Sequence, residues 1–403
     1  MSSTSVRVKF ICRLGYGDAL PKDEEFAGDV AVFGSNGQYA TTRERNTNVP
    51  AIVLGRKGSY GKVNWAPEGC FASDTTFFVD DRFTTENLRW LYWNLQSLGL
   101  DKGSQEAAVP GINRESVYEE RICHPKLANQ VTVAKYLDRE IARIDGLITE
   151  KVRMLALLEE KRAALISRVV TQGLDPDALV KASGHAWLGE IPTHWEAIRI
   201  KLITASLDQG SSPIAANTPA ATDELGVLKL SAVTKGRFKR EENKALRGTD
   251  HEEHLLALRK GDVLITRGNT PDLVADVACV PEDEPNLLLP DLIYRLRVKE
   301  EKILAEYLTA FLTTAEARFQ IRRDARGSSG SMVKVSQGHV LDWLTPLPPL
   351  FEQVEIMNYL RRTEERFQSI AREVSSSLSL LSDRRAALIS AAVTGQIPLE
   401  EMT

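Results

Sequence analysis

The sequence contains little cysteine, and its cysteines are not arranged to bind a metal. Among 403 residues there are four cysteines and no CxxC pair; they are Cys12, Cys70, Cys123 and Cys279. Isolated thiols favour a reducing compartment and argue against a structural zinc site. No apolar run is long enough to span a membrane, and residues 1–15 lack the charged start and apolar core of a signal peptide. These absences predict a cytoplasmic protein without membrane contacts.

Motifs for nucleotide binding and methyl transfer are missing as well. Residues 55–62 cannot form a P-loop, because Arg56 stands where glycine is required and Val63 where serine or threonine is required. An adenine methyltransferase would need a glycine-rich turn for S-adenosylmethionine and an Asp or Asn before two prolines, where this chain has Leu347. No nucleophile elbow is present. We therefore expect no catalytic residue and no bound cofactor.

Two weaker patterns resemble metal-dependent sites. His251 and His254 lie three residues apart, but they do not form an HExxH motif and no cysteine nearby could act as a third ligand. Asp291, Glu300 and Lys302 loosely imitate the centre of a magnesium-dependent nuclease, although the Glu/Lys pair also fits the solvated start of a helix. We expect no metal site, and a self-sufficient nuclease stays open as a minor alternative.

The net charge of −4 does not indicate a nucleic-acid-binding protein, since such domains usually have a basic surface. DNA binding would need basic residues concentrated locally, or a partner that supplies phosphate contacts. Acidic residues lie on the two repeated segments described next, among them Glu140, Glu150, Glu159, Glu160, Glu364, Glu365 and Glu373. This balance also fits a coiled-coil scaffold whose heads bind protein, which is the second alternative.

The chain contains an internal duplication. The hexapeptide Arg-Ala-Ala-Leu-Ile-Ser occurs at residues 162–167 and again 223 residues later, at 385–390. The same offset pairs Pro125 with Pro348, and the register continues without a gap as far as Thr171. Similarity held in one register over this length indicates a repeat.

Both copies predict a long helix, at residues 127–172 and 350–395. Apolar residues recur every 3.5 residues, which indicates a coiled coil, and a rod of about 65 to 70 Å follows from the helical rise. Connectivity favours antiparallel helices with approximate two-fold symmetry. The predicted seam includes Leu137, Ile144, Leu155, Leu158, Leu165, Leu360, Phe367, Leu378, Leu381 and Leu388, and the charged residues Lys151, Arg162, Glu364 and Arg385 interrupt it.

The remaining segments predict two mixed heads of an α+β protein. Head one covers residues 1–126 and head two residues 191–349, with a connector at 173–190 and a tail at 396–403. In head two, residues 263–268 resemble residues 53–58 of head one, while the heads otherwise differ. Expected strands lie at 6–11, 30–33, 51–54 and 75–79, and expected head helices at 86–97 and 303–318.

Three loops have compositions suited to DNA contact. Residues 34–39 are small and polar, residues 55–62 mix glycine with basic and aromatic side chains, and residues 235–240 are basic with one aromatic. Ordinary glycine turns with solvated charges are the alternative. The candidate contacts are Asn36, Gln38, Arg43, Arg56, Lys57, Tyr60 and Lys62 in head one, and Lys235, Arg237, Lys239, Arg267 and Asn269 in head two.

The sequence resembles the specificity (S) subunit of Type I restriction-modification systems over nearly its whole length. The resemblance rests on Leu-Pro-Pro-Leu at 347–350 followed by Glu352 and Gln353, on the repeated hexapeptide, and on Leu-Gly-Glu-Ile-Pro-Thr-His-Trp at 188–195. The last of these resembles the entry to a target-recognition domain. The first copy departs from the pattern at His124 and Asn129.

The resemblance implies a non-catalytic reader of double-stranded DNA. Each head would be a target-recognition domain for one half of a bipartite, asymmetric sequence, and the helices would set the spacing between the halves. Two methyltransferase subunits would dock on the helices, bind S-adenosylmethionine and methylate adenine N6, and motor and nuclease subunits could join them. Unlike heads would read a non-palindromic site, since only identical heads require a palindrome.

Overall fold

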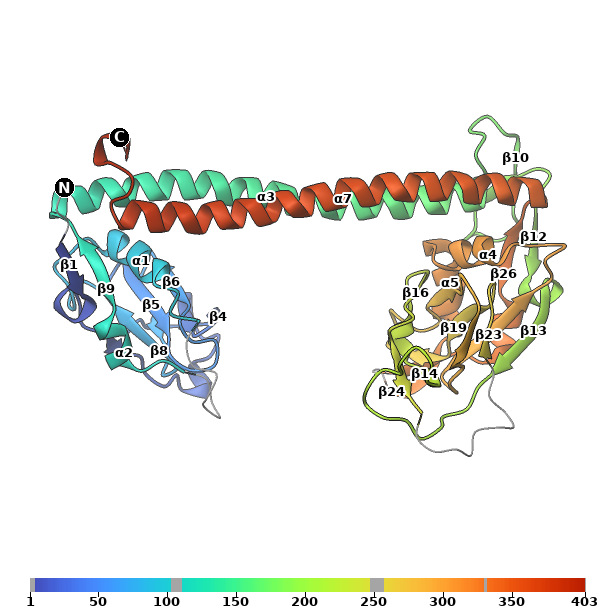
Figure 1. The fold of residues 1–403 in the computed structure, drawn as a ribbon, viewed down its shortest axis with the longest axis horizontal. Helices are drawn as coiled ribbons and strands as arrows, with labels where there is room; N and C mark the ends of the chain where they lie inside the picture. The colour runs from blue at the N-terminus through green and yellow to red at the C-terminus, as the bar shows by residue number, and fades with distance from the viewer. Residues whose placement is uncertain (1–3, 103–110, 247–256, 330–331, 403) are drawn as a thin grey trace. The chain divides into compact units, whose positions relative to one another are not determined.

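The computed structural model describes residues 4–102, 111–246, 257–329 and 332–402. They form two compact units: unit 1 combines Met1–Met154 with Glu373–Thr403, and unit 2 is Leu155–Arg372. The division runs through two long helices, so each unit contains one head and a part of each helix (Figure 1). Strand-rich heads combined with long helices confirm the predicted α+β class.

The long helices are α3 (Leu127–Gln172) and α7 (Leu350–Val393). Both predicted ends of α3 are confirmed, and α7 ends two residues before the predicted boundary. Gly173 follows α3 with φ of 82°, and Gly395 has φ of 76° just after α7. Glycine adopts this left-handed conformation without steric cost, so it ends a helix.

The two helices run antiparallel, as the sequence predicts. In unit 1, Arg385 of α7 donates to Asp145 of α3 at 2.8 Å. In unit 2, Arg162 of α3 donates to Glu364 of α7. The first part of each helix therefore lies beside the last part of the other. Two of the charges that interrupt the apolar seams, Arg162 and Glu364, pair with one another.

The predicted seam residues are all buried or half-buried. Leu137 is fully buried because head one covers it, whereas Leu155 and Leu158 are half-buried. A pair of helices can shield only the faces that meet, so the middle of the seam keeps partial exposure. Neither long helix, nor another helix in the described part of the chain, has an apolar stretch that could cross a membrane.

Head one contains two main sheets and a short pair of strands. The four-stranded sheet has the order β2 (Gly15–Tyr16), β8 (Thr76–Val79), β5 (Ala51–Gly55), β6 (Val63–Ala66); the three-stranded sheet has the order β4 (Gly37–Thr42), β3 (Val30–Gly34), β7 (Phe71–Ala72); and β1 (Thr4–Arg7) pairs with β9 (Arg121–His124). Helix α1 (Leu88–Ser97) contributes Trp90 and Leu91 to a core that also contains Leu54 of β5 and Leu137 of α3. The first sheet and the long helix thus share one core.

Most predicted elements of head one are confirmed, with one error. The strands expected at 30–33, 51–54 and 75–79 and the helix expected at 86–97 are present with shifts of one or two residues. The strand expected at 6–11 is wrong, because β1 ends at Arg7 and a 3-10 helix follows at Val8–Phe10. The turn brings Val8 and Ile11 into the core, which an extended strand would not do because successive side chains alternate between its faces.

Head two repeats the four-stranded sheet and adds a second. The first has the order β13 (Thr204–Gln209), β23 (Ile293–Val298), β19 (Val263–Thr266), β21 (Val277–Cys279); the second has the order β17 (Asn243–Ala245), β14 (Gly226–Leu228), β22 (Glu284–Leu288), β18 (Ala257–Leu258). The smaller sheets are β15 (Val233–Thr234) with β16 (Arg237–Phe238), β20 (Gly268–Asn269) with β25 (Met332–Lys334) and β24 (Arg326–Ser329), β12 (Glu196–Arg199) with β26 (Leu344–Leu347), and β10 (Val180–Ala182) with β11 (Glu190–Pro192).

The single helix expected at 303–318 is wrong, because two helices occupy this region. Helix α4 (Ala305–Leu312) ends before Thr314, whose hydroxyl caps α5 (Ala315–Asp324) by accepting the amide of Ala317. Threonine is a good cap and a weaker helix former, so the chain restarts there.

The structure extends the repeat upstream of Pro125. Helix α2 (Arg114–Glu119) and strand β9 recur as α6 (Gln337–Asp342) and β26, each 223 residues later. Both copies therefore enter their long helix through the same helix and strand, although sequence similarity alone stops at the proline.

Candidate nucleic-acid interface

A buried glutamine attaches each head to a long helix. Gln130 of α3 and Gln353 of α7 occupy equivalent repeat positions, and both are fully buried. The side-chain oxygen of Gln130 accepts the amide of Asn87 at 2.9 Å, and that of Gln353 accepts the amide of Leu304 at 2.8 Å. Asn87 and Leu304 are the N-cap residues of α1 and α4. Each side-chain amide also donates to the carbonyl of the proline five residues earlier, at 3.0 and 2.8 Å. Each head is therefore attached to its long helix by the same glutamine contacts, which we call the frame.

A second contact in this frame has its charges reversed between the units. Arg89, the second residue of α1, donates to Asp138 of α3 at 2.7 Å. Glu306, the second residue of α4, pairs with Arg361 of α7. Asp138 and Arg361 are also equivalent repeat positions. An ion pair is kept at this position in both units, although the positive and negative residues have changed places. The position of the contact is therefore retained, and the order of its charges is not.

The central strands of the two heads end in equivalent arginines. Strand β5 lies between β8 and β6, and β19 lies between β23 and β21, all in antiparallel pairs. Arg56 directly follows β5 and Arg267 directly follows β19. The sequence comparison of residues 53–58 with 263–268 is one residue out of register, because it aligns Arg56 with Thr266.

Backbone hydrogen bonds confirm this equivalence. The amide of Arg56 donates to the carbonyl of Thr75 at 2.8 Å, and its carbonyl accepts the amide of Ile112 at 2.9 Å. The amide of Arg267 donates to the carbonyl of Leu292, the residue before β23, at 2.8 Å. The carbonyl of Arg267 accepts the amide of Val335 at 2.9 Å. Ile112 and Val335 are again 223 residues apart. Each head thus holds one arginine at the same corner of its sheet.

In head one, the structure brings together the two loops that the sequence indicates. The ammonium of Lys62 donates to the side-chain oxygen of Asn36 at the tip of the β3–β4 hairpin. Gly55 has no room for a side chain, since a Cβ atom there would lie 2.8 Å from the carbonyl oxygen of Ser35. Lys57 is exposed beside this junction. Asn36, Lys57 and Lys62 therefore share one surface.

Arg56 lies on an aromatic platform. Its guanidinium is 5.2 Å from the ring centre of Tyr16 and 5.8 Å from that of Phe77. The guanidinium of Arg114 is also close to this platform, 5.3 Å from the ring centre of Tyr16. Stacking on aromatic rings holds a guanidinium in place without consuming its hydrogen-bond donors. Tyr16 and Arg114 were missed in the sequence, because they lie far from the loops in the chain and carry no local signal.

Three other predicted residues of head one occupy separate positions. Gln38 is exposed near the hairpin tip, on β4. Tyr60 is half-buried within the second loop. Arg43 follows the far end of β4, about 20 Å from Gly37 at the tip at 3.4 Å per residue, and its guanidinium is 3.8 Å from Glu24. Arg43 therefore lies apart from the Arg56 surface.

In head two, Arg267 and Asn269 lie at the corresponding corner. Asn269 belongs to β20, which pairs with β25, and both side chains are half-buried. On the neighbouring strand β23, Tyr294 pairs with Ile265 of β19, and its hydroxyl donates to the carbonyl of Val335 at 3.2 Å. Burial raises the pKa of Tyr294, and the positive charge of Arg267 acts in the opposite direction. An aromatic residue therefore accompanies the arginine in both heads.

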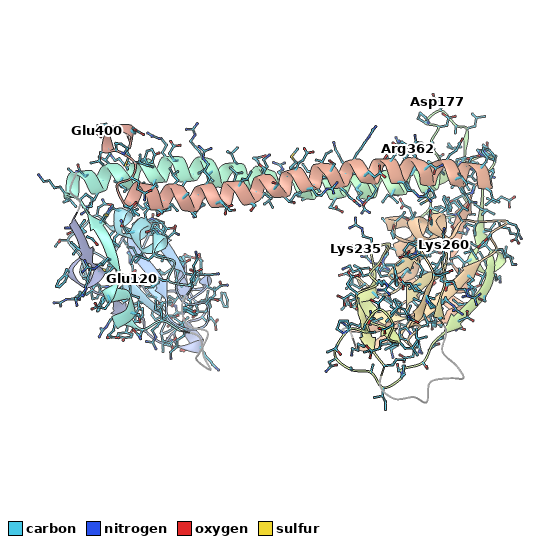
Figure 2. All side chains as sticks on the ribbon, in the orientation of Figure 1. Glu120, Asp177, Lys235, Lys260, Arg362 and Glu400 are labelled. Carbon is cyan, nitrogen blue, oxygen red and sulfur yellow. The ribbon has the colours of Figure 1, made fainter. Side chains whose placement is uncertain are left out.

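The hairpin between β15 and β16 carries the other predicted residues of head two. Its turn has positive φ at Lys235 (47°) and Gly236 (80°), and the carboxylate of Asp276 accepts the Lys235 amide at 2.9 Å. Figure 2 shows Lys235 on the side of the head nearest the paired helices. Lys239 is exposed. Lys235 and Lys239 are therefore available at the surface.

Arg237 of the same hairpin is engaged by a long helix. Its guanidinium donates to Glu364 of α7 at 2.8 Å, and Glu364 also accepts from Arg162 and Gln368. Burial opposes ionisation of Glu364, but hydrogen bonds from Arg162 and Gln368 outweigh it and lower its pKa. Because a charged partner already occupies Arg237, we leave it out of the reading surface proposed below.

The residues of the nuclease-like pattern do not come together. Asp291 precedes β23, whereas Glu300 and Lys302 follow it. Six residues of strand separate them by about 20 Å, too far to share a metal ion. Among the described residues, no group of three His, Cys, Asp or Glu side chains could hold a metal. His251 and His254 lie outside the described residues.

Comparison with known proteins finds similarity to one class of restriction-system subunit. Over 190 residues, 47% of this chain and 31% of the relative, the sequence is 27% identical to the Type I restriction enzyme EcoEI specificity subunit of Escherichia coli. Over 284 residues, 68% of this chain and 57% of the relative, it is 25% identical to the EcoKI specificity subunit of Escherichia coli strain K12. The chain is thus similar to Type I restriction specificity subunits. It matches about a third to somewhat over half of the length of these two relatives.

A solved structure shares the fold of this chain. The structure concerns complex assembly and conformational transition of the type I R-M system, and one of its chains matches with a TM-score of 0.67 at 14% identity, over 98% of both chains. At this identity the likeness concerns the fold alone. No family model matches the sequence.

Proposed function

We propose that this chain reads a two-part DNA sequence for a Type I restriction-modification complex. The observation that carries the proposal is the repeated frame: the same glutamine and the same strand–helix entry hold two heads that otherwise differ. A repeated frame presents two surfaces in equivalent ways, and unlike heads give them different specificities. Two different readers joined in one chain suit an asymmetric, interrupted target.

The reading surface of each head is centred on its strand-end arginine. Arginine can donate two hydrogen bonds to guanine in the major groove, a contact worth about 1–3 kcal/mol of discrimination. Head one would read with Arg56, Asn36 and Gln38, while Lys57 and Lys62 bind phosphate. Tyr60 would support this loop. In head two, Arg267 and Asn269 would read bases, and Lys235 and Lys239 would bind phosphate.

Two methyltransferase subunits would dock on the long helices. Large apolar residues remain exposed at equivalent repeat positions: Leu147 (53%) with Ile370 (40%), and Leu157 (47%) with Leu380 (67%). The Asp145–Arg385 pair brings Leu147 and Leu380 within about one helical turn in unit 1. An isolated exposed leucine needs no explanation, but apolar exposure repeated in both copies supports a binding surface.

The chemistry would belong to the partners. Each methyltransferase subunit would bind S-adenosylmethionine and methylate adenine N6 in one half-site, and motor and nuclease subunits could join them. Partners that also contact phosphate would compensate for the net charge of −4. This chain would contribute base recognition, spacing and docking, and no catalytic residue.

The test is co-expression with a cognate methyltransferase subunit, followed by sequencing that maps methylated adenines. The unmodified pair should methylate a bipartite motif. Arg56→Ala should relax specificity in one half only, Arg267→Ala in the other half only, and Arg43→Ala should change neither. If either arginine variant alters both halves equally, the assignment of one reader to each head is wrong.

A protein-assembly scaffold is the competing function, which the exposed leucines and the acidic balance would also suit. It predicts a stable complex with the methyltransferase subunit but no sequence-selective, salt-sensitive DNA binding by that complex. A gel shift of the assembled complex at several salt concentrations separates the two, because phosphate contacts make DNA affinity fall steeply with salt.

A further inference from the structure

A cavity of about 260 Å³ lies inside unit 2, where the end of α3, the connector after it and the first turns of α7 meet. Ile356 is almost fully buried at its base, whereas Phe351 at its edge is 66% exposed. Leu174, Ala178 and Pro192 add further apolar lining. An exposed phenylalanine beside a cavity is a feature of binding surfaces.

The rim of the cavity is acidic. Asp175, Glu352 and Glu355 all line it. Glu352 is already engaged, since it accepts hydrogen bonds from His194 at 2.7 Å and from the Trp195 indole at 2.9 Å. Within the described ranges, no hydrogen bond or ion pair engages the carboxylate of Glu355. The rim therefore offers unneutralised negative charge to a cationic group.

The corresponding place in unit 1 is covered by the tail of the chain itself. The tail ends in a 3-10 helix at Leu399–Met402, and Met402 is only 3% exposed. It joins the core that contains Val133, the repeat equivalent of Ile356. Figure 1 shows the tail lying against the first turns of α3, as the connector lies against the first turns of α7.

The two copies also differ in the residues that would meet a partner. Phe351 corresponds to Ala128, and Glu355 corresponds to Thr132. At these two positions the first copy thus has small, neutral side chains, whereas the second copy has an aromatic and an acidic side chain. A partner that docks on both copies would find an anchor at only one of them.

We propose that the cavity receives a large apolar side chain flanked by lysine or arginine from one of the two methyltransferase subunits. This inference rests on the proposed function, since it assumes that these subunits dock on the long helices. An aromatic anchor beside a desolvated pocket is a typical hot spot of a protein interface. The two docking positions are therefore unequal, and the position at the second copy binds more tightly.

A second copy of this chain is a poor occupant. Its tail is the segment that covers the equivalent place in unit 1, but this tail would bring Glu400 and Glu401 against Glu355. Like charges brought together at an interface disfavour association. The charge of the rim selects a basic partner segment instead.

The experiment titrates the full-length chain with the purified methyltransferase subunit and resolves the two binding steps by calorimetry and mass photometry. Phe351→Ser should weaken one step by about tenfold or more, as loss of a hot spot does, and leave the other unchanged. Glu355→Lys should weaken the same step and reduce its salt dependence. Ala128→Ser and Thr132→Lys, the matched changes in the first copy, should alter neither step appreciably.

The outcomes separate this inference from the proposed function. If the unaltered chain binds no methyltransferase subunit, the proposed function fails and the inference fails with it. If two subunits bind but Phe351→Ser and Glu355→Lys leave both steps unchanged, only the cavity assignment is overturned. Unaltered melting temperatures would show that the variants are folded, as expected because Phe351 and Glu355 are exposed.

Discussion

Arg56 in unit 1 and Arg267 in unit 2 are fixed by the same two backbone hydrogen bonds, yet their surroundings differ. Arg56 lies over Tyr16 and Phe77, whereas Arg267 lies near Tyr294 and beside the short strand β20. The backbone frame is therefore shared, and the neighbouring side chains differ. On the proposed function, such an arrangement would let the recognition residues change without changing how the heads are held.

The frame itself shows the same pattern. Gln130 and Gln353 make the same contacts with an N-cap amide and a proline carbonyl, but the adjacent ion pair has exchanged its charges between the units. A buried glutamine must satisfy fixed backbone groups, so few other residues can replace it. A partly exposed ion pair is free to reverse as long as both partners change. The comparison separates contacts that geometry fixes from contacts that only need complementarity.

Substitutions in the seam between the long helices should reduce stability the most. Leu158→Asp places a carboxylate between the helices and should destabilise unit 2 by about 2–4 kcal/mol, because burying an unpaired charge is costly. Its exposed neighbour Leu157 is the control: Leu157→Asp should leave stability nearly unchanged and weaken binding of the methyltransferase subunit. Denaturant unfolding and size exclusion with the partner distinguish the two variants. Equal loss of stability in both would contradict the assigned seam.

Loss of the buried glutamine should reduce the stability of either unit nearly as much as a substitution in the seam. Gln130→Leu and Gln353→Leu each leave a buried amide and a buried carbonyl without a partner, at about 2–3 kcal/mol. Hydrogen exchange should rise at the start of α1 in the first variant and at the start of α4 in the second. The exposed Gln396→Leu serves as the control and should change neither. Similar effects in the two units would confirm that the frame is shared.

Substitutions in the ion pairs whose charges are exchanged between the units should have the smallest effect on stability. Arg89→Glu should cost about 1–2 kcal/mol, because Arg89 is largely shielded and stacks on aromatic rings. Arg361→Glu should cost less than about 1 kcal/mol, because that pair is exposed. The compensated variants Arg89→Glu with Asp138→Arg, and Glu306→Arg with Arg361→Glu, should recover part of each loss in thermal unfolding. If neither double variant regains stability, the two charges of each pair do not stabilise the fold through their interaction.

Local patterns in the sequence account well for the helices and poorly for the surfaces. The boundaries of α3 follow from a 3.5-residue repeat and a glycine at its end, both of which are local features. The break between α4 and α5 depends on a threonine cap that competes with apolar periodicity across the same residues. The engagement of Arg237 by Glu364 joins residues 127 positions apart, which composition cannot reveal.

The sequence by itself determined the duplication, the antiparallel helices, the α+β heads and the resemblance to specificity subunits, because repeats and periodicity are properties of residue order. Only the tertiary structure decided that Arg56 and Arg267 are equivalent, that Arg114 reaches Tyr16, and that one copy is covered by the tail while the other keeps an open acidic cavity. These facts depend on which distant segments meet, and chain order does not encode such contacts in any local pattern.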